Sequence, residues 1–426
     1  MVAALGAGRS SGDEGMWLFS DPPTERIARD HGVRLTPEWM THLQQSSVRF
    51  SSGGSGAFVS PDGLVLTNHH VGADAIQKLG DAGHDHLRDG FCAATRDAEL
   101  RCHDLELNVL VSISDVTTRV QTAVAGEPSA ERAFEKRREV LAEIERESLD
   151  ATGLRSDVVT LFQGGAYHLY RFRRYTDVRL VFAPEQQIAF YGGDPDNFEF
   201  PRYDLDICFF RAYEDGKPAR VEHCLTWADA AVREGETVFV SGHPGHTDRG
   251  STIAELVSLR DRRLPLDLEI LARREAAIGA YALRGPEERR QAIQDLHGVE
   301  NGRKARGGIL AGLLDPRLMA TRRRSEDSIR RELGMEEGDE QSPFARIERA
   351  QRTLDEILER ERLLEGAAAF DSIYFRNART ILRAVAEREK PSGQRLREYR
   401  DSNRGPLELR LFSARPIDDA YEVVKL

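Results

Sequence analysis

Two adjacent histidines, His69 and His70, follow the short apolar run Leu64–Leu66. Imidazole at the end of a strand can act as a general base. A metal-binding pair is a weaker interpretation, because neighbouring strand residues point in opposite directions and no carboxylate stands at a supporting spacing. A core or surface histidine without a catalytic role is the plain alternative. Upstream, Ser55 lies in a Gly-Ser-Gly stretch, which raises the question of whether it is a nucleophile.

The residues before the histidines predict a β-hairpin. Pro61–Gly63 separates two apolar runs, Phe58–Val59 and Leu64–Leu66, and Asp-Gly at a reversal is a strong hairpin signal. We expect the chain to leave the second strand at Thr67 and to present both histidines beside a cleft. A general base needs such a position, held by rigid structure.

The stretch Gly54–Val71 resembles the first barrel of bacterial chymotrypsin-fold serine peptidases. It reads Gly-Ser-Gly-x-Phe-Val, then Asp-Gly-x-Val-Leu-Thr-Asn-x-His-Val. In those peptidases the histidine that ends the motif is the base of the catalytic triad, and that position is His70. The resemblance gives His69 no triad role. It also makes Ser55 a structural residue of an inner strand, because the nucleophile of these enzymes comes from the second barrel.

A triad base needs a carboxylate on its other ring nitrogen, and two aspartates compete for this role. Asp204 and Asp206 precede the apolar run Ile207–Phe210. The stretch Asp-Ile-Cys-Phe-Phe-Arg resembles the strand that carries the acid in these barrels, which selects Asp206. Asp206 is also the aspartate that directly abuts the apolar run, where it would be partly removed from water.

Further stretches resemble the S46 family of dipeptidyl-peptidases. They are "DEGMW", the histidine stretch itself, "DVRLVFAPE", "YGGDPDNFEFPRYDLDICFFRAY" and "GHPGHTDR". The resemblance implies a periplasmic or cell-surface serine exopeptidase that removes dipeptides from peptides with free N-termini. It also implies a double β-barrel that carries the triad, a helical domain that caps the cleft, and a possible homodimer. No metal or organic cofactor is expected.

The same resemblance implies how the substrate's α-amino group is held. Asn197 matches an asparagine of the family that contributes to this site, and Phe198 stands where the family usually has tryptophan. Asn301, in an Asn-x-x-Lys pattern, is a second candidate. Such groups are physically necessary, because a cationic amine that enters a closed cleft must be met by amide oxygens and a carboxylate.

The nucleophilic serine is not identified among these residues. No stretch resembling Gly-Asn-Ser-Gly-Ser-Pro occurs in the 426 residues. The economical interpretation is an N-terminal fragment that holds His70 and Asp206 but lacks the second barrel, and that is inactive alone. Two alternatives stay open: an HtrA-like serine endopeptidase, and a non-catalytic binding protein with the chymotrypsin fold.

The pattern of the chain divides it near residue 251. Residues 1–251 predict the first chymotrypsin-like β-barrel, with strands such as 105–113, 158–162, 167–172, 177–182, 206–213 and 236–242 and one helix at Ser129–Ser148. Residues 252–426 predict a mostly α-helical cap domain. Its repeating apolar residues include Leu264, Leu268 and Leu271, and later Leu354 and Ile357. Strand-like residues return at Leu407–Ser413.

The composition excludes several functions. The net charge is −11, which argues against a general nucleic-acid binder. No apolar run is long enough to predict a membrane span. Four cysteines have spacings that fit no zinc motif, so that buried free thiols are expected, although a disulfide such as Cys92–Cys102 would be possible in an oxidising compartment.

Overall fold

The computed structural model describes residues 15–426 except 82, 246–248, 336–337, 367–369 and 413–416. The described residues form two compact units, which we call the sheet unit and the helical unit. The sheet unit contains the described parts of Met1–Ala189, Leu205–Pro244 and Ala386–Ala414. The helical unit contains those of Phe190–Asp204, Gly245–Val385 and Arg415–Leu426. The chain therefore passes between the units several times, whereas the sequence suggested a single boundary at 251/252.

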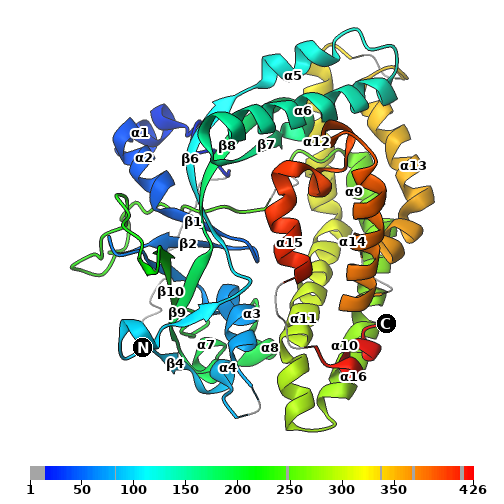
Figure 1. Ribbon diagram of the computed structural model, residues 1–426. Coiled ribbons are helices and arrows are strands. Elements are labelled where there is room, and N and C mark those ends of the chain that lie inside the picture. Colours follow the sequence, from blue (N-terminus) through cyan, green and yellow to red (C-terminus); the bar gives the residue numbers. More distant parts are fainter. Residues whose placement is uncertain (1–14, 82, 246–248, 336–337, 367–369, 413–416) are drawn as a thin grey trace, which may run out of the picture. The chain divides into compact units, whose positions relative to one another are not determined.

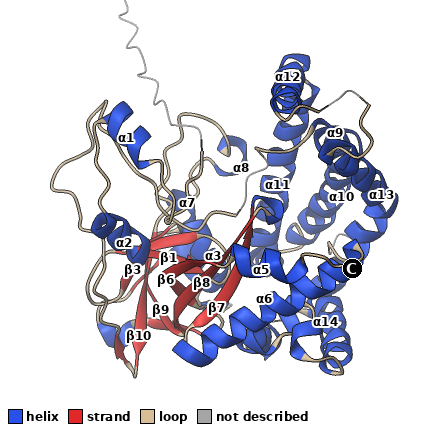
Figure 2. Cartoon of the chain, turned by 90° about the horizontal axis from the view of Figure 1, so that it is seen from above, coloured by secondary structure: helices blue, strands red, loops and turns tan. Residues whose placement is uncertain are grey.

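Eleven strands of the described residues form one sheet, in which all pairs of neighbours are antiparallel (Figure 2). The strands are β1 (Ser47–Phe50), β2 (Ser55–Phe58), β3 (Leu64–Thr67), β4 (Phe91–Cys92), β5 (Leu100–Cys102), β6 (Leu107–Asp115), β7 (Arg155–Leu161), β8 (Ala166–Tyr175), β9 (Asp177–Ala183), β10 (Cys208–Glu214) and β11 (Lys217–Pro218). Their order is β4-β9-β10-β3-β2-β1-β6-β8-β7, with β11 on β10 and β5 on β9. Among these described strands no pairing joins β4 to β7, so a closed chymotrypsin-like barrel stays a prediction.

The predicted hairpin is confirmed. Strands β2 and β3 pair with Phe58 opposite Val65, and the N–H of Val59 donates to the carbonyl oxygen of Leu64 at 2.8 Å. Gly63 in the turn has φ +69°, a conformation that glycine adopts without steric cost. Both Phe58 and Val65 are at most 1% exposed, so the hairpin is fixed to the core from one face.

An aromatic core lies against these strands. Phe50, Phe58, Phe172 and Phe210 are each at most 2% exposed, and the rings of Phe50 and Phe210 meet edge-to-face with centroids 5.8 Å apart. Burial of one such side chain contributes about 1.5–3 kcal/mol relative to exposure. Strands β3 and β10 therefore have rigid support up to the ends at which the histidines and Asp206 follow.

In chain order the helices of the sheet unit come before, between and after the strands (Figure 1). They are α1 (Thr24–His31), α2 (Pro37–Ser46), α3 (His69–Leu79), α4 (His86–Asp89), α5 (Thr117–Val124), α6 (Ala130–Thr152), α7 (Gln186–Ala189) and α15 (Arg404–Phe412), with 3₁₀ turns η1 (Arg96–Ala98), η2 (Phe162–Gly164), η4 (Ser392–Gln394), η5 (Arg397–Tyr399) and η6 (Asp401–Asn403). The predicted helix at 129–148 is confirmed as α6. The Ser129 hydroxyl caps it by accepting from the N–H of Arg132 at 3.2 Å.

The helical unit contains α8 (Gly193–Asp196), α9 (Ile253–Ser258), the π-helical turn η3 (Leu259–Arg263), α10 (Leu264–Ala282), α11 (Pro286–Leu314), α12 (Pro316–Glu332), α13 (Pro343–Leu364), most of α14 (Ile373–Arg388) and α16 (Asp419–Val424). Helix α9 begins with a reciprocal capping box between Thr252 and Glu255. The change to helical structure that the sequence predicted after residue 251 is confirmed for this unit. None of the described helices combines the length and the apolar character that crossing a bilayer requires.

Two strand predictions are wrong. Residues 236–242 form no strand, and Val240 is 98% exposed, because a β-branched sequence becomes a strand only where a neighbouring strand is available. Residues Leu407–Phe412 lie in helix α15. Leu407 and Leu411 are four residues apart and share a helix face as readily as the alternating leucines would share a strand face, so short apolar patterns of this kind are ambiguous.

A buried ion pair, which the sequence did not predict, lies where the chain returns to the sheet unit. Arg400, between η5 and η6, lies 3.2 Å from a carboxylate oxygen of Glu145 on α6, and the two side chains are 4% and 1% exposed. The other oxygen of Glu145 accepts the N–H of Val158 at 3.0 Å. This carboxylate therefore joins β7, α6 and the segment 386–414.

Candidate active site

His70 and Asp206 come together because β3 and β10 are antiparallel neighbours. Thr67, the last residue of β3, pairs with Cys208, the first residue of β10. The residues that follow β3 and those that precede β10 therefore lie at the same edge of the sheet. The two histidines are the first residues of helix α3, after an extended Asn68, rather than the end of a strand.

The contact between the two side chains is short and direct. Nδ1 of His70 lies 2.6 Å from Oδ2 of Asp206, and the backbone N–H of His70 donates to Oδ1 of the same carboxylate at 3.0 Å. The Asn68 amide donates to the backbone oxygen of Asp206 at 3.1 Å. The carboxylate thus accepts from two N–H groups of His70, and the Asn68 amide also donates to its Oδ2 at 3.3 Å. This is the arrangement that fixes an imidazole in one orientation.

The electrostatics of Asp206 favour its ionised form. Partial burial alone would raise the pKa of its carboxyl, but the hydrogen bonds from the ring and the backbone of His70, together with the charges of both histidines, outweigh burial and lower this pKa. Because an ionised carboxylate can only accept, Nδ1 of His70 carries the hydrogen and Nε2 is the ring nitrogen able to take a proton. The His70 side chain is 71% exposed, so that Nε2 belongs to an accessible group.

His69 has a different environment. It is 4% exposed, and its Nε2 has no hydrogen-bond partner among the described residues. Burial lowers the pKa of the His69 ring, with the charge of Asp206 acting in the opposite direction and His70 acting in the same one. A buried, neutral ring of this kind packs against the core and is not placed to exchange protons with a substrate.

Ser55 is engaged in hydrogen bonds within the sheet unit. Its hydroxyl accepts the N–H of His243 at 2.7 Å, and its carbonyl oxygen accepts the Thr67 hydroxyl at 2.7 Å. A Cβ added at Gly242 would lie 2.7 Å from the Ser55 oxygen, so the segment 241–243 packs closely on this serine. These contacts agree with the structural role that the sequence suggested.

Asp204, the competing acid, has another partner. In the helical unit its carboxylate forms an ion pair with Nε of Arg202 at 3.1 Å. The distinction that the sequence drew between Asp204 and Asp206 thus corresponds to two different environments in the structure.

The two asparagines predicted to hold the substrate amine also come together, within the helical unit. Asn197 follows α8, and its amide nitrogen donates to the side-chain oxygen of Asn301 on α11 at 3.1 Å. Phe198 is 62% exposed, with φ +69°. An exposed ring next to this pair is suitable as the wall of a binding site.

Two residues in the surroundings of the asparagines were not singled out by the sequence. Lys304 lies one helical turn after Asn301, donates to the backbone oxygen of Asp194 and forms an ion pair with the Asp194 carboxylate at 3.2 Å. Arg202 donates to the side-chain oxygen of Asn197 at 3.1 Å. The Asn-x-x-Lys spacing was a usable signal for Lys304, because residues three apart share a helix face. Nothing in the sequence pointed to Arg202.

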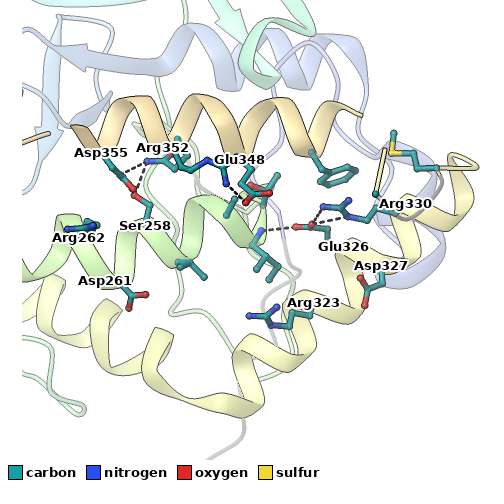
Figure 3. A pocket seen from close by; sticks show the side chains of 18 of the residues that line it. Ser258, Asp261, Arg262, Arg323, Glu326, Asp327, Arg330, Glu348, Arg352 and Asp355 are labelled. Atoms are coloured by element: carbon teal, nitrogen blue, oxygen red, sulfur yellow. Dashed lines mark hydrogen bonds and ion pairs between the residues drawn. The ribbon is translucent and has the colours of Figure 1, made fainter. Parts of the chain in front are cut away.

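A large polar cavity of about 920 Å³ lies elsewhere in the helical unit, lined by α9, α12 and α13 (Figure 3). It contains none of the predicted site residues. Some of its carboxylates have partners within the lining: Glu326 accepts from Arg330, and Asp355 accepts from Ser258 (Figure 3). These pairs give no indication of a substrate.

The histidine and cysteine residues offer no metal site in the described part of the chain. No three histidine, cysteine, aspartate or glutamate side chains gather there closely enough to hold an ion. All four cysteines are free thiols, so Cys92 and Cys102 form no disulfide. Burial raises the pKa of Cys102 to about 12 and also raises that of Cys208, which makes both thiols poor nucleophiles.

Comparison with known proteins decides the family, since the model of the family Peptidase S46 matches residues 12–426. The chain belongs to the S46 peptidase family. Among its relatives, dipeptidyl-peptidase 7 of Phocaeicola vulgatus is 29% identical over 343 residues, which cover 74% of this chain and 47% of that protein. An Asp/Glu-specific dipeptidyl-peptidase of Shewanella putrefaciens is 28% identical over 98% of this chain and 58% of that protein.

Solved structures show the same fold. Porphyromonas endodontalis DPP11 in complex with the dipeptide Arg-Asp has a TM-score of 0.73 at 23% identity, over 84% of this chain and 55% of that one. The complex of DPP11 with Arg-Glu also has a TM-score of 0.73, at 24% identity over 94% and 60% of the two chains. This chain therefore spans about half the length of the S46 proteins that it matches.

Proposed function

We propose that this protein is a serine-type dipeptidyl-peptidase that releases dipeptides from peptides with free N-termini. The observation that carries the proposal is the 2.6 Å contact between His70 Nδ1 and Asp206 Oδ2, in a chain of the S46 family. Relatives named dipeptidyl-peptidases support the reaction class. Family membership also favours this function over an HtrA-like endopeptidase.

His70 is the general base of the proposed reaction. Its Nε2 takes the proton of a serine hydroxyl as that oxygen attacks the peptide carbonyl, and then gives the proton to the leaving amine. Asp206 holds the tautomer and stabilises the imidazolium that forms. We place the nucleophilic serine outside these 426 residues, because Ser55 is engaged by His243 and no Gly-x-Ser-Gly stretch follows the acid in the sequence.

Asn197 and Asn301 bind the substrate's α-amino group in this proposal, with Phe198 beside them. Each amide oxygen has two lone pairs and can accept from an ammonium group in addition to its present donor. A site that binds a free ammonium group rejects a blocked N-terminus, because acetylation removes the charge and adds bulk. This accounts for exopeptidase rather than endopeptidase activity.

The remaining features of the proposal follow the family resemblance. The sheet unit is the first barrel of a chymotrypsin-like double barrel, and the helical unit is the cap domain. The protein acts in the periplasm or at the cell surface, forms a homodimer, and needs neither a metal nor an organic cofactor. Peptides are its partners, and nucleic acids are not.

The protein expressed from its complete gene tests the proposal. It should hydrolyse dipeptidyl chromogenic substrates with a free N-terminus, and N-acetylated forms of the same substrates should not be turned over. Inactivation by EDTA that zinc reverses, or equal turnover of acetylated substrates, would contradict it. A folded protein without any turnover would favour the non-catalytic alternative.

The two histidines provide a matched pair of variants. His70→Ala should lower kcat by about 10³-fold or more, because the loss of a triad member leaves only binding and oxyanion stabilisation. His69→Ala should act mainly on stability, since that ring is buried. If His69→Ala proved to be the inactive variant with an unchanged melting temperature, the assignment of the base would be wrong by one residue.

A further inference from the structure

A chain of hydrogen bonds connects Arg202 to both asparagines of the proposed amine site. Nη1 of Arg202 donates to Oδ1 of Asn197 at 3.1 Å. Nδ2 of Asn197 then donates to Oδ1 of Asn301, also at 3.1 Å. All three residues belong to the helical unit.

The guanidinium group sets the direction of this chain. An asparagine amide can turn by 180° and exchange its donor and acceptor ends, but arginine has only donors. The end of Asn197 that faces Arg202 must therefore be the oxygen. The nitrogen then faces Asn301, whose near atom must in turn be its oxygen. One arginine thus fixes the orientation of both amides.

The orientation determines what the pair can bind. With both oxygens engaged by one donor each, each keeps a second lone pair that can accept from an ammonium group. If Asn197 turned over, its nitrogen would take the place of one of these oxygens, and its oxygen would draw the nitrogen of Asn301 toward it. The pair would then present N–H groups where a cationic amine needs acceptors.

Arg202 is itself held in place from two directions. Its Nε lies 3.1 Å from the Asp204 carboxylate, and its guanidinium carbon lies 4.8 Å from the centroid of the Phe190 ring. The side chain is 19% exposed. The ring of Phe190 packs against His297 at 4.7 Å. Asp204 also offsets the positive charge of Arg202, which would otherwise repel a cationic ligand nearby.

We propose that Arg202 is a positioning residue that fixes the acceptor polarity of the Asn197–Asn301 pair and thereby makes the site selective for a protonated α-amine. Asp204 acts with it as the neutralising partner. The inference rests on the proposed function, because it takes the asparagine pair as the amine site. It adds a specificity-determining residue that contacts the amide and not the reacting atoms.

Two substitutions of Arg202 separate the effect of its donor-only side chain from the effect of the space that the side chain fills. Arg202→Gln fills similar space but can donate or accept, so it no longer forces the orientation of Asn197. Arg202→Lys has only donors and keeps the forced orientation. We expect Arg202→Gln to raise KM for free-amine substrates about 10- to 100-fold, the effect of losing a hydrogen bond to a charged group, with a smaller change in kcat. Arg202→Lys should stay closer to the wild type.

Arg303→Gln is the control for the loss of an arginine from the same unit. Arg303 lies two residues after Asn301 and forms an ion pair with Glu275 on α10. It makes no hydrogen bond to either asparagine among the described residues. Its removal should leave KM and the preference for free over acetylated substrates unchanged.

The same substitution of Arg202 in an Asn197→Asp variant makes the test independent of any general loss of structure. Asn197→Asp presents acceptors at both ends, so its polarity does not depend on Arg202. Arg202→Gln should therefore raise KM much less in the Asn197→Asp background than in the wild type, as measured in a double-mutant cycle. Calorimetric binding of a product dipeptide gives the same comparison without turnover.

Four outcomes decide between the possibilities. An equal effect of Arg202→Gln in both backgrounds, or a KM of folded Arg202→Gln within about twofold of the wild type, overturns the inference, since loss of the hydrogen bond predicts about tenfold or more. A much smaller effect in the Asn197→Asp background supports it. If the wild type itself fails to distinguish free from acetylated N-termini, the proposed function fails first, and the inference about the amine fails with it.

Discussion

Replacing Asp206 by asparagine should remove catalysis while leaving the shape of the site intact. The carboxylate accepts two hydrogen bonds from His70, from its ring at 2.6 Å and from its backbone at 3.0 Å, and a longer one from the Asn68 amide at 3.3 Å. An amide has a single acceptor atom for these donors. The Asn68 amide can turn over and the imidazole can change its tautomer, but the backbone N–H can only donate, so we expect it to keep the oxygen of the new side-chain amide.

The amide nitrogen would then face Nδ1 of His70. Because that nitrogen donates, Nδ1 must accept, and the hydrogen of the neutral ring moves to Nε2. The base then has no lone pair toward the substrate. In serine peptidases the corresponding exchange lowers kcat about 10⁴-fold through the wrong tautomer. At about 1.4 kcal/mol per factor of ten, this corresponds to roughly 5.5 kcal/mol of transition-state stabilisation.

The assay compares kcat and KM of Asp206→Asn with those of the wild type, in the protein expressed from its complete gene. Asp74→Asn is the matched control, because Asp74 lies on α3, the helix that begins with the two histidines, but is 58% exposed and pairs with Lys78. KM should change little for Asp206→Asn, and the melting temperature should stay near that of the wild type. Retention of more than about a tenth of the wild-type kcat would refute the tautomer argument, which requires a loss of several factors of ten.

Two further predictions concern stability and can be measured by urea unfolding of this chain. Burial lowers the pKa of His243 to about 4, with the charge of Arg49 acting in the same direction and a hydrogen bond to Ser47 opposing it. As the pH falls below about 6.5, His243 of the unfolded chain binds a proton, whereas His243 of the folded chain stays neutral until about pH 4. The free energy of unfolding should therefore fall by up to roughly 3 kcal/mol between pH 6.5 and 4. His243→Phe should flatten that decline, and an unchanged slope would contradict the assignment. Separately, Arg400→Met should destabilise the sheet unit by about 3 kcal/mol because it leaves Glu145 buried without its cation, whereas Arg404→Met, at an exposed pair, should change stability much less.

The hairpin and the strands around it were predictable because local signals and burial agree. Asp62-Gly63 specifies the reversal, and Phe58 and Val65 beside it are buried. In β6 the apolar residues Leu107 and Val109 alternate in sequence as in a strand, although Asn108 between them is buried as well. The wrong strand at 236–242 shows the limit of such signals. Its residues are β-branched, but strand formation depends on a partner strand, and a single sequence does not say which segments will be neighbours.

The division into units was less predictable for a related reason. Composition changes near residue 251, and beyond this position the described residues form helices and no strand. The segments 190–204 and 386–414 join units that their neighbours in sequence do not. Their membership depends on contacts over long sequence distances, such as that between Arg400 and Glu145. A charged pair of this kind has no periodic pattern, because each member is one residue in an otherwise ordinary helix or loop.

The candidate site shows the same contrast at the scale of single residues. The apolar run after Asp206 signals a strand, and the pairing of that strand with β3 carries the carboxylate to His70. Asp204, two residues earlier, has the same side chain and a similar local sequence, yet it neutralises Arg202. Local sequence could therefore select Asp206 over Asp204 as the acid, but it could not predict the ion pair that Asp204 forms. Under our proposal that Arg202 orients Asn197, the short stretch from 197 to 206 contains both the proposed amine-recognition residue and the acid of the proposed triad. A substitution between these positions should thus be tested for KM and kcat separately, since the two effects arise from different partners.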